Sequence, residues 1–164
     1  MITANRYQII SKYLEEKYRG KNITLLDVGC GGVDFITFVN KLFPEYEIIG
    51  VDKNLEILLE DKKNLENAVE LVNADGRKLP FKEKSIDVVQ DIGCSTGRPE
   101  EREIINECIR VCKKEYIRFS DEKFGRPLKE SIYENKRKYE GMHLKVNKVY
   151  ADSPKKRLLF FLNF

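Results

Sequence analysis

Short runs of apolar residues alternate along the chain with amphipathic segments whose apolar positions recur every three or four residues. Runs of the first kind are typical of buried strands, and segments of the second kind are typical of helices packed on one side. The predicted strands are residues 22–28, 46–52, 68–75, 86–93 and 115–120. The predicted helices are residues 1–22, 34–43, 54–66 and 98–114. This alternation predicts an α/β fold, with a doubly wound, mostly parallel sheet and helices on both faces.

The last part of the chain has a different pattern. Residues 143–150 alternate between apolar and polar, residues 152–154 read Asp-Ser-Pro, and residues 157–164 are mostly apolar. Two strands joined by a short turn must be antiparallel neighbours. We therefore expect the sheet to end in a C-terminal antiparallel strand pair. No linker or repeat divides the chain, so residues 1–164 are predicted to form one domain.

In two of the predicted helices, particular residues indicate where the helix begins and ends or which side is apolar. The helix at 98–114 begins with Pro99 and three glutamates, which suit a helix N-terminus, and we expect Lys113 and Lys114 in its last turn. The helix at 54–66 is expected to have four leucines on one side, namely Leu55, Leu58, Leu59 and Leu65.

Composition narrows the class of protein. The chain has 164 residues, of which 41% are hydrophobic and 35% charged, values typical of a soluble globular domain. No apolar run approaches the roughly 18 residues that a membrane span needs, and the N-terminal residues 1–22 lack the apolar segment of a secretory signal. We therefore predict a cytoplasmic protein with reduced thiols. Its four cysteines lack the paired spacing of a zinc site, and no metal is expected.

Charge is unevenly distributed although the net charge is only +3. Residues 123–157 hold eleven basic and four acidic side chains, whereas residues 1–122 hold nineteen basic and twenty-three acidic ones. Two interpretations stay open. The basic segment binds an anionic partner such as RNA, or it is a lysine-rich solvated surface. A homodimer or a partner subunit is equally open.

The strongest local signal is LLDVGCGG at residues 25–32, where an apolar strand enters a glycine-rich turn before a helix. Glycines at such a turn let the backbone bend sharply and approach a ligand. A dinucleotide fingerprint would place a third glycine where Asp34 stands, and a carboxylate there repels a pyrophosphate. The Gly-Lys-Ser/Thr end of a phosphate-binding loop is absent. Asp27, before the glycines, instead suits a cationic ligand.

These residues resemble the first motif of class I S-adenosylmethionine-dependent methyltransferases, and the order of elements resembles their seven-stranded fold. The resemblance implies S-adenosylmethionine as cofactor, S-adenosylhomocysteine as product and an unidentified acceptor, a small molecule or RNA. It implies that Asp52 binds both ribose hydroxyls and that Asp75 binds the adenine amino group. The full implied cofactor set is Asp27, Gly29, Cys30, Gly31, Asp52, Lys53, Asp75, Gly76, Asp91 and Ile92.

Simpler interpretations of these residues exist. Gly29 and Gly31 also suit a plain strand–helix turn, Asp52 also suits a helix N-cap, and Asp75 also suits a loop. A catalytically degenerate subunit that supports a partner enzyme is the alternative to an active methyltransferase.

Catalysis needs few groups, because methyl transfer requires mainly alignment of a nucleophile and exclusion of water. A base is needed only for a protonated acceptor, and Asp91, His143 and Tyr133 are the candidates. His143 is the only histidine, and its ordinary pKa suits proton transfer. Residues 121–142 are the one sizeable insertion between strands, and we expect them to form a lid over the acceptor.

Overall fold

The computed structural model describes the backbone of residues 2–62, 65, 69–92, 99–121, 143–149 and 157–163. Side chains are described for residues 7–60, 62, 65, 69–92 and 99–118. The expected lid at 121–142, with Tyr133, lies outside the described residues apart from the backbone of its first residue. So do most of the basic segment at 123–157 and the side chain of His143.

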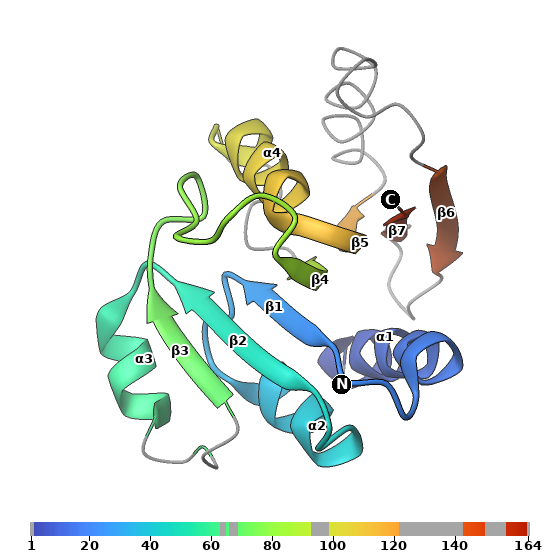
Figure 1. Cartoon of the computed structure of the whole chain (residues 1–164), viewed down its shortest axis with the longest axis horizontal. Helices are drawn as coiled ribbons and strands as arrows, with labels where there is room; N and C mark the ends of the chain where they lie inside the picture. Colours follow the sequence, from blue (N-terminus) through green and yellow to red (C-terminus); the bar gives the residue numbers. More distant parts are fainter. Residues whose placement is uncertain are drawn as a thin grey trace.

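Helices and strands alternate through the first two thirds of the chain (Figure 1). The helices are α1 (Ile2–Tyr18), α2 (Asp34–Leu42), α3 (Leu55–Asp61) and α4 (Glu101–Val111). The strands are β1 (Thr24–Val28), β2 (Glu47–Asp52), β3 (Val69–Asn73), β4 (Ile86–Ile92), β5 (Cys112–Asp121), β6 (His143–Val149) and β7 (Arg157–Asn163).

Five of the strands form a parallel sheet in the order β3-β2-β1-β4-β5. The α/β class and the parallel sheet that the sequence predicts are thereby confirmed. Beside β5, the backbones of β7 and β6 continue the sheet with antiparallel pairing. The chain passes from β1 outward to β2 and β3, and then returns to β4 on the other side of β1. Ligands of open α/β sheets bind where the order reverses in this way, beyond the carboxyl ends of the strands.

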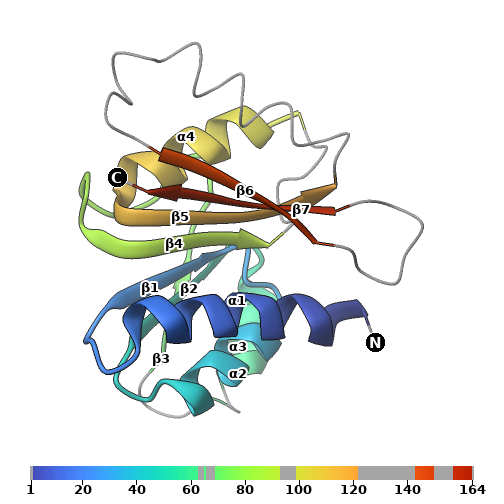
Figure 2. The ribbon, with the colours of Figure 1, turned by 90° about the vertical axis from the view of Figure 1, so that its right-hand side faces the viewer.

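Helices cover both faces of the sheet, as Figure 2 shows, with α1, α2 and α3 on one side and α4 on the other. The core is accordingly divided into two apolar clusters. Leu25 of β1 and Val88 of β4 belong to the α1–α2–α3 side, and their neighbours Leu26 and Val89 belong to the α4 side. Alternate residues of a strand point to opposite faces, so strands buried on both faces read as continuous apolar runs.

The tightest packing between β2 and its helix is at Gly50. A Cβ atom there would lie 2.5 Å from the Cδ1 of Ile36 in α2 and 2.8 Å from the Cδ2 of Leu71 in β3. Both distances are below any normal contact, so α2 can lie this close to the sheet only because residue 50 is glycine.

Two helices end earlier than the sequence predicts. Helix α3 ends at Asp61, so Leu65 lies outside it, and of its three leucines Leu58 is buried whereas Leu55 and Leu59 are 50% and 56% exposed, because the short helix presents one narrow stripe to the sheet. In α4 the helix ends at Val111, and Lys113 and Lys114 belong to β5. Their ammonium groups lie 3.9 and 2.8 Å from the carboxylate of Asp87 in β4, so they stabilise the strand pair rather than a helix terminus.

Hydrogen bonds and an ion pair to a buried carboxylate hold helix α1 against the sheet. Glu115 of β5 is fully buried and accepts hydrogen bonds from the hydroxyls of Tyr13 and Tyr18, and Lys17 forms an ion pair with it at 3.0 Å. Burial, together with the charge of Glu115, raises the pKa of Tyr18 above its ordinary value, so this phenol remains a donor. A buried carboxylate is tolerated only when donors satisfy it in this way.

We expect Tyr18→Phe to lower the free energy of unfolding by about 1.5 kcal/mol, because a hydrogen bond of 3.0 Å to a buried charge is lost. Urea unfolding followed by circular dichroism measures this. Tyr46→Phe is the matched control, since its hydroxyl makes only a 3.5 Å contact with the carbonyl of Leu14. That variant is expected to lose less than about 0.5 kcal/mol. Equal losses in the two variants would contradict the anchoring role of Glu115.

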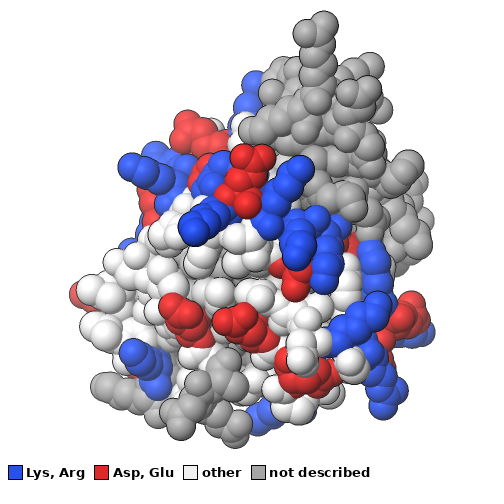
Figure 3. All heavy atoms as spheres, viewed as in Figure 1, with Lys and Arg blue, Asp and Glu red and all other residues white. Residues whose placement is uncertain are grey.

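Charges of both signs are interspersed on the face shown in Figure 3, as far as its residues are described. The basic segment that the sequence singles out lies almost wholly beyond them. Among the described residues, no helix is long and apolar enough to cross a membrane.

Candidate functional site

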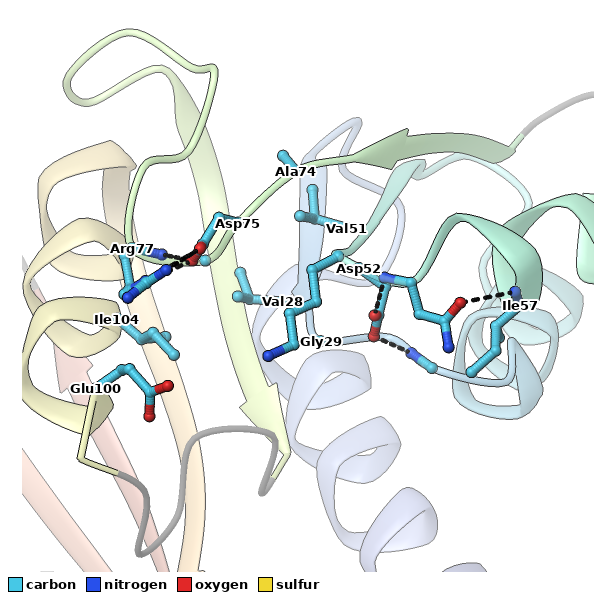
Figure 4. A pocket seen from close by; sticks show the side chains of 14 residues that line it. Val28, Gly29, Val51, Asp52, Ile57, Ala74, Asp75, Arg77, Glu100 and Ile104 are labelled. Atoms are coloured by element: carbon cyan, nitrogen blue, oxygen red, sulfur yellow. Dashed lines mark hydrogen bonds and ion pairs between the residues drawn. The ribbon is translucent and has the colours of Figure 1, made fainter.

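A pocket of about 370 Å³ lies beyond the carboxyl ends of β1, β2 and β3, where α4 closes it from the other side (Figure 4). This is the place where the order of the strands reverses. Its size is in the range of small-molecule and cofactor sites. The lining residues are Val28, Gly29, Gly31, Val51, Asp52, Lys53, Asn54, Ile57, Ala74, Asp75, Gly76, Arg77, Glu100 and Ile104.

The glycine-rich turn has the strained backbone that its sequence predicts. Gly29 and Gly31 have φ values of 72° and 50°, in the left-handed region that favours glycine. The N–H groups of the turn are already hydrogen-bonded to oxygen atoms of the protein. Those of Gly29 and Cys30 donate to the carbonyl of Val51 at 2.7 and 3.0 Å, and that of Gly31 donates to the carboxylate of Asp52 at 2.9 Å. A bound pyrophosphate would accept hydrogen bonds from such N–H groups. Because these groups already donate to protein oxygens, the turn does not suit a pyrophosphate.

Asp52 closes β2 and lines the pocket with its carboxylate held in place by the backbone. One oxygen accepts the N–H of Gly31 at 2.9 Å and the other accepts the N–H of Asn54 at 2.9 Å. A carboxylate has about four acceptor positions, so one position on each oxygen is left beside these two bonds. The N-cap of α3 is Asn54, whose side chain accepts the N–H groups of Glu56 and Ile57. The interpretation of Asp52 as that N-cap is therefore wrong, since Asn54 caps the helix.

Asp75 lies across the pocket from Asp52, and its carboxylate points toward Arg77 (Figure 4). Hydrogen bonds from Arg77 lower the pKa of Asp75 to about 2, so this carboxylate is ionised at neutral pH. Asp52 and Asp75 thus place carboxylates on opposite sides of the pocket, and Glu100 adds a third at the start of α4. The apolar side chains of Val28 and Val51 lie between Asp52 and Asp75 (Figure 4).

The structure brings together six of the ten cofactor residues that the resemblance implies. The pocket is lined by Gly29, Gly31, Asp52, Lys53, Asp75 and Gly76. The other four, Asp27, Cys30, Asp91 and Ile92, are not among its described lining residues. Asp27 and Cys30 are buried, and Ile92 is half-buried on the α1–α2–α3 side of the sheet.

Asp91 is placed inside the protein, on the α4 side of β4. It is fully buried, and its carboxylate lies 2.6 Å from the guanidinium of Arg118 in β5. Arg118 also pairs with Glu101 at the start of α4 and lies 3.5 Å from the hydroxyl of Tyr116. Three charged side chains therefore tie β4, β5 and the first turn of α4 together. The alternation of β4 turns Asp91 away from the face that carries Asp27.

His143 begins β6 at the edge of the sheet, opposite Asn163 of β7. Asn163 is in turn opposite Glu115, near the start of β5. The backbone of His143 is therefore three strands from β4, about 14 Å at ordinary strand spacing. It also lies toward the end of β5 that is remote from the pocket edge.

The sequence analysis missed the pocket residues at the start of α4 and one residue of the β3–β4 connection. Glu100, the N-cap residue of α4, Ile104 within α4 and Arg77 of the connection line the pocket. Arg77 stands two residues after Asp75, a spacing at which the side chain of an aspartate meets the backbone N–H of a turn, and this signal was available in the sequence.

Known proteins share both the sequence pattern and the fold. The family model described as a methyltransferase domain matches residues 25–115, more than half of the chain. A demethylmenaquinone methyltransferase of Thermotoga maritima is 25% identical over 124 residues, 68% of this chain and 54% of the relative. One of Lactobacillus johnsonii is 34% identical over 95 residues, 54% of this chain and 38% of the relative. The chain thus spans about half the length, or less, of these curated relatives.

Among solved structures, magnesium protoporphyrin IX methyltransferase from Synechocystis, with bound S-adenosylmethionine, has a TM-score of 0.80. It is 13% identical, and the match covers 99% of this chain and 80% of that one, so the likeness is one of fold. The motif, the sheet order and the family match agree. The chain belongs to the class I S-adenosylmethionine-dependent methyltransferase family.

Proposed function

We propose that this protein binds S-adenosylmethionine in the pocket beyond β1, β2 and β3 and transfers its methyl group to an acceptor, leaving S-adenosylhomocysteine. When bound, the cofactor supplies a methyl group made electrophilic by its sulfonium. The protein's part is to bind and orient the reactants and to exclude water.

The observation that carries this proposal is the geometry of Asp52. The backbone N–H groups of Gly31 and Asn54 each take one acceptor position and fix the carboxylate at the pocket wall. The two positions that remain match the two neighbouring hydroxyls of a ribose. The turn at 29–31 uses its N–H groups internally, so the ligand beside it is not a phosphate. A nucleoside without phosphates fits both facts.

Two roles expected from the sequence change in this proposal. Asp91 is a positioning residue, because its buried carboxylate is bound to Arg118 and faces α4. His143 is not part of the proposed site, because its backbone lies on the far edge strand. Acceptor contacts are proposed for residues 121–142 and for the segment that follows β4.

For the acceptor, demethylmenaquinone is the first compound to test, because two relatives are named for it. RNA is the second, because the segment at 123–157 is strongly basic. The proposal also takes residues 1–164 as one domain with a complete seven-stranded sheet. It places the protein in the cytoplasm, where the buried cysteines Cys30, Cys108 and Cys112 stay reduced. A homodimer or a partner subunit is compatible with it.

Calorimetric titration with S-adenosylmethionine and S-adenosylhomocysteine tests the site, and we expect micromolar binding of both. Transfer of a labelled methyl group to each acceptor then tests the activity. Binding without transfer to either acceptor, alone or with a partner protein present, would favour the supporting-subunit alternative. No binding by the folded protein would contradict the proposed function.

A further inference from the structure

The carboxylate of Asp75 is already hydrogen-bonded to the side chain of Arg77, which belongs to the same loop. The Nε of Arg77 donates to both of its oxygens at 3.0 Å, and Nη2 donates to Oδ2 at 2.6 Å. The backbone N–H of Arg77 donates to Oδ1 at 2.9 Å. Three N–H groups of one residue therefore donate to one carboxylate, with the Nε–H shared between its two oxygens, and both residues line the pocket.

Arg77 occupies most of the Asp75 carboxylate. A carboxylate has about four acceptor positions, and three N–H groups of Arg77 point at Asp75, one of them shared between both oxygens. Asp52 at the other end of the pocket receives two N–H groups, neither of them from a charged side chain. An exocyclic amino group of a bound purine must therefore compete with the guanidinium of Arg77 for the oxygens of Asp75.

Carboxylates other than that of Asp75 also act on the guanidinium of Arg77. The hydrogen bonds and the charge of Asp75 raise the pKa of Arg77, and Glu103 in the first turn of α4 and Glu100 just before that helix raise it further. Glu100 lines the same side of the pocket as Arg77, with Ile104 drawn between them in Figure 4. The side chains of Arg77 and Asp75 are 48% and 40% exposed, so the pair can open without disturbing the core.

We propose that Arg77 competes with the adenine of the cofactor for Asp75, and that it moves toward Glu100 when the cofactor binds. This inference rests on the proposed function and names Arg77 as a residue that sets cofactor affinity and selectivity. The guanidinium moves between two acidic positions, one on the β3–β4 connection and one at the start of α4. The free protein holds it on Asp75, and binding must open that pair.

The test uses S-adenosylhomocysteine and its 6-deamino analogue, in which purine replaces adenine. We expect Arg77→Ala to bind S-adenosylhomocysteine about two- to fivefold more tightly than the wild type, a factor typical of one exposed ion pair. The deamino analogue has no amino group to offer Asp75, so its affinity is expected to stay unchanged. Lys78→Ala is the matched control, because Lys78 is exposed, equally charged and outside the pocket lining.

Salt provides a second measurement. Because the Arg77–Asp75 pair is exposed, raising the ionic strength screens it, and the gap between wild type and Arg77→Ala should narrow. If wild type binds S-adenosylhomocysteine but Arg77→Ala binds it equally or more weakly, the competition is overturned while the proposed function stands. If no variant binds it, the proposed function fails and this inference fails with it.

Discussion

Asp52→Ala is expected to weaken the binding of S-adenosylmethionine about a hundredfold. The carboxylate offers one acceptor position on each oxygen after its bonds to Gly31 and Asn54, and both are proposed to bind ribose hydroxyls. Hydrogen bonds to a charged group are worth about 1.5 kcal/mol each at the low end of their range, so the loss of two corresponds to roughly a hundredfold change in affinity. The same substitution releases the N–H of Gly31, which loosens the glycine-rich turn.

Calorimetry on wild type, Asp52→Ala and Asp34→Ala measures this effect. Asp34 is an exposed acid at the start of α2 that does not line the pocket, so its substitution removes the same charge without touching the site. Asp52→Asn keeps one oxygen acceptor and is expected to fall between the two. If a folded Asp52→Ala protein binds the cofactor as tightly as Asp34→Ala does, Asp52 does not bind the cofactor.

The parts of this site that the sequence predicted follow from a simple rule. In a parallel sheet the carboxyl ends of all strands lie at one edge, so residues that close two apolar runs must lie near each other. This places Asp52 and Asp75 at one pocket although 22 residues lie between them in the sequence. Gly29 and Gly31 were predictable because only a glycine-rich turn joins strand to helix so tightly.

The side-chain partner of Asp91 was not predictable, because it comes from a distant part of the chain. Asp91 follows the apolar run of β4 just as Asp52 follows that of β2, and the local pattern gives both the same meaning. Arg118, the partner of Asp91, is 27 residues away on β5. The strand at 115–120 does contain a signal, because Glu115 and Arg118 flank the apolar residues Tyr116 and Ile117, which are fully buried. A charge in such a strand requires a partner on the covering helix or the next strand.

Arg118→Met is expected to lower the free energy of unfolding by about 3–5 kcal/mol, the loss typical of breaking a buried ion pair from one side. Arg118 has no exposed surface, and its guanidinium lies between the carboxylates of Asp91 and Glu101. Burial lowers the pKa of Arg118, but Tyr116 and Asp91 raise it more, so the side chain stays charged. Without it, two carboxylates remain in a nearly dry interior with no opposite charge between them.

Urea unfolding at pH 7 measures the loss, and Arg19→Met is the control. Arg19 pairs with Glu15 on the surface of α1 at 2.9 Å, with side chains 76% and 49% exposed, so its substitution is expected to change stability by less than about 0.5 kcal/mol. Adding Glu101→Gln to Arg118→Met removes one of the two stranded charges and should recover part of the stability. If Arg118→Met loses no more than Arg19→Met, the buried network does not hold α4 to the sheet. The wall of the pocket formed by Glu100 and Ile104 would then be positioned by apolar packing alone.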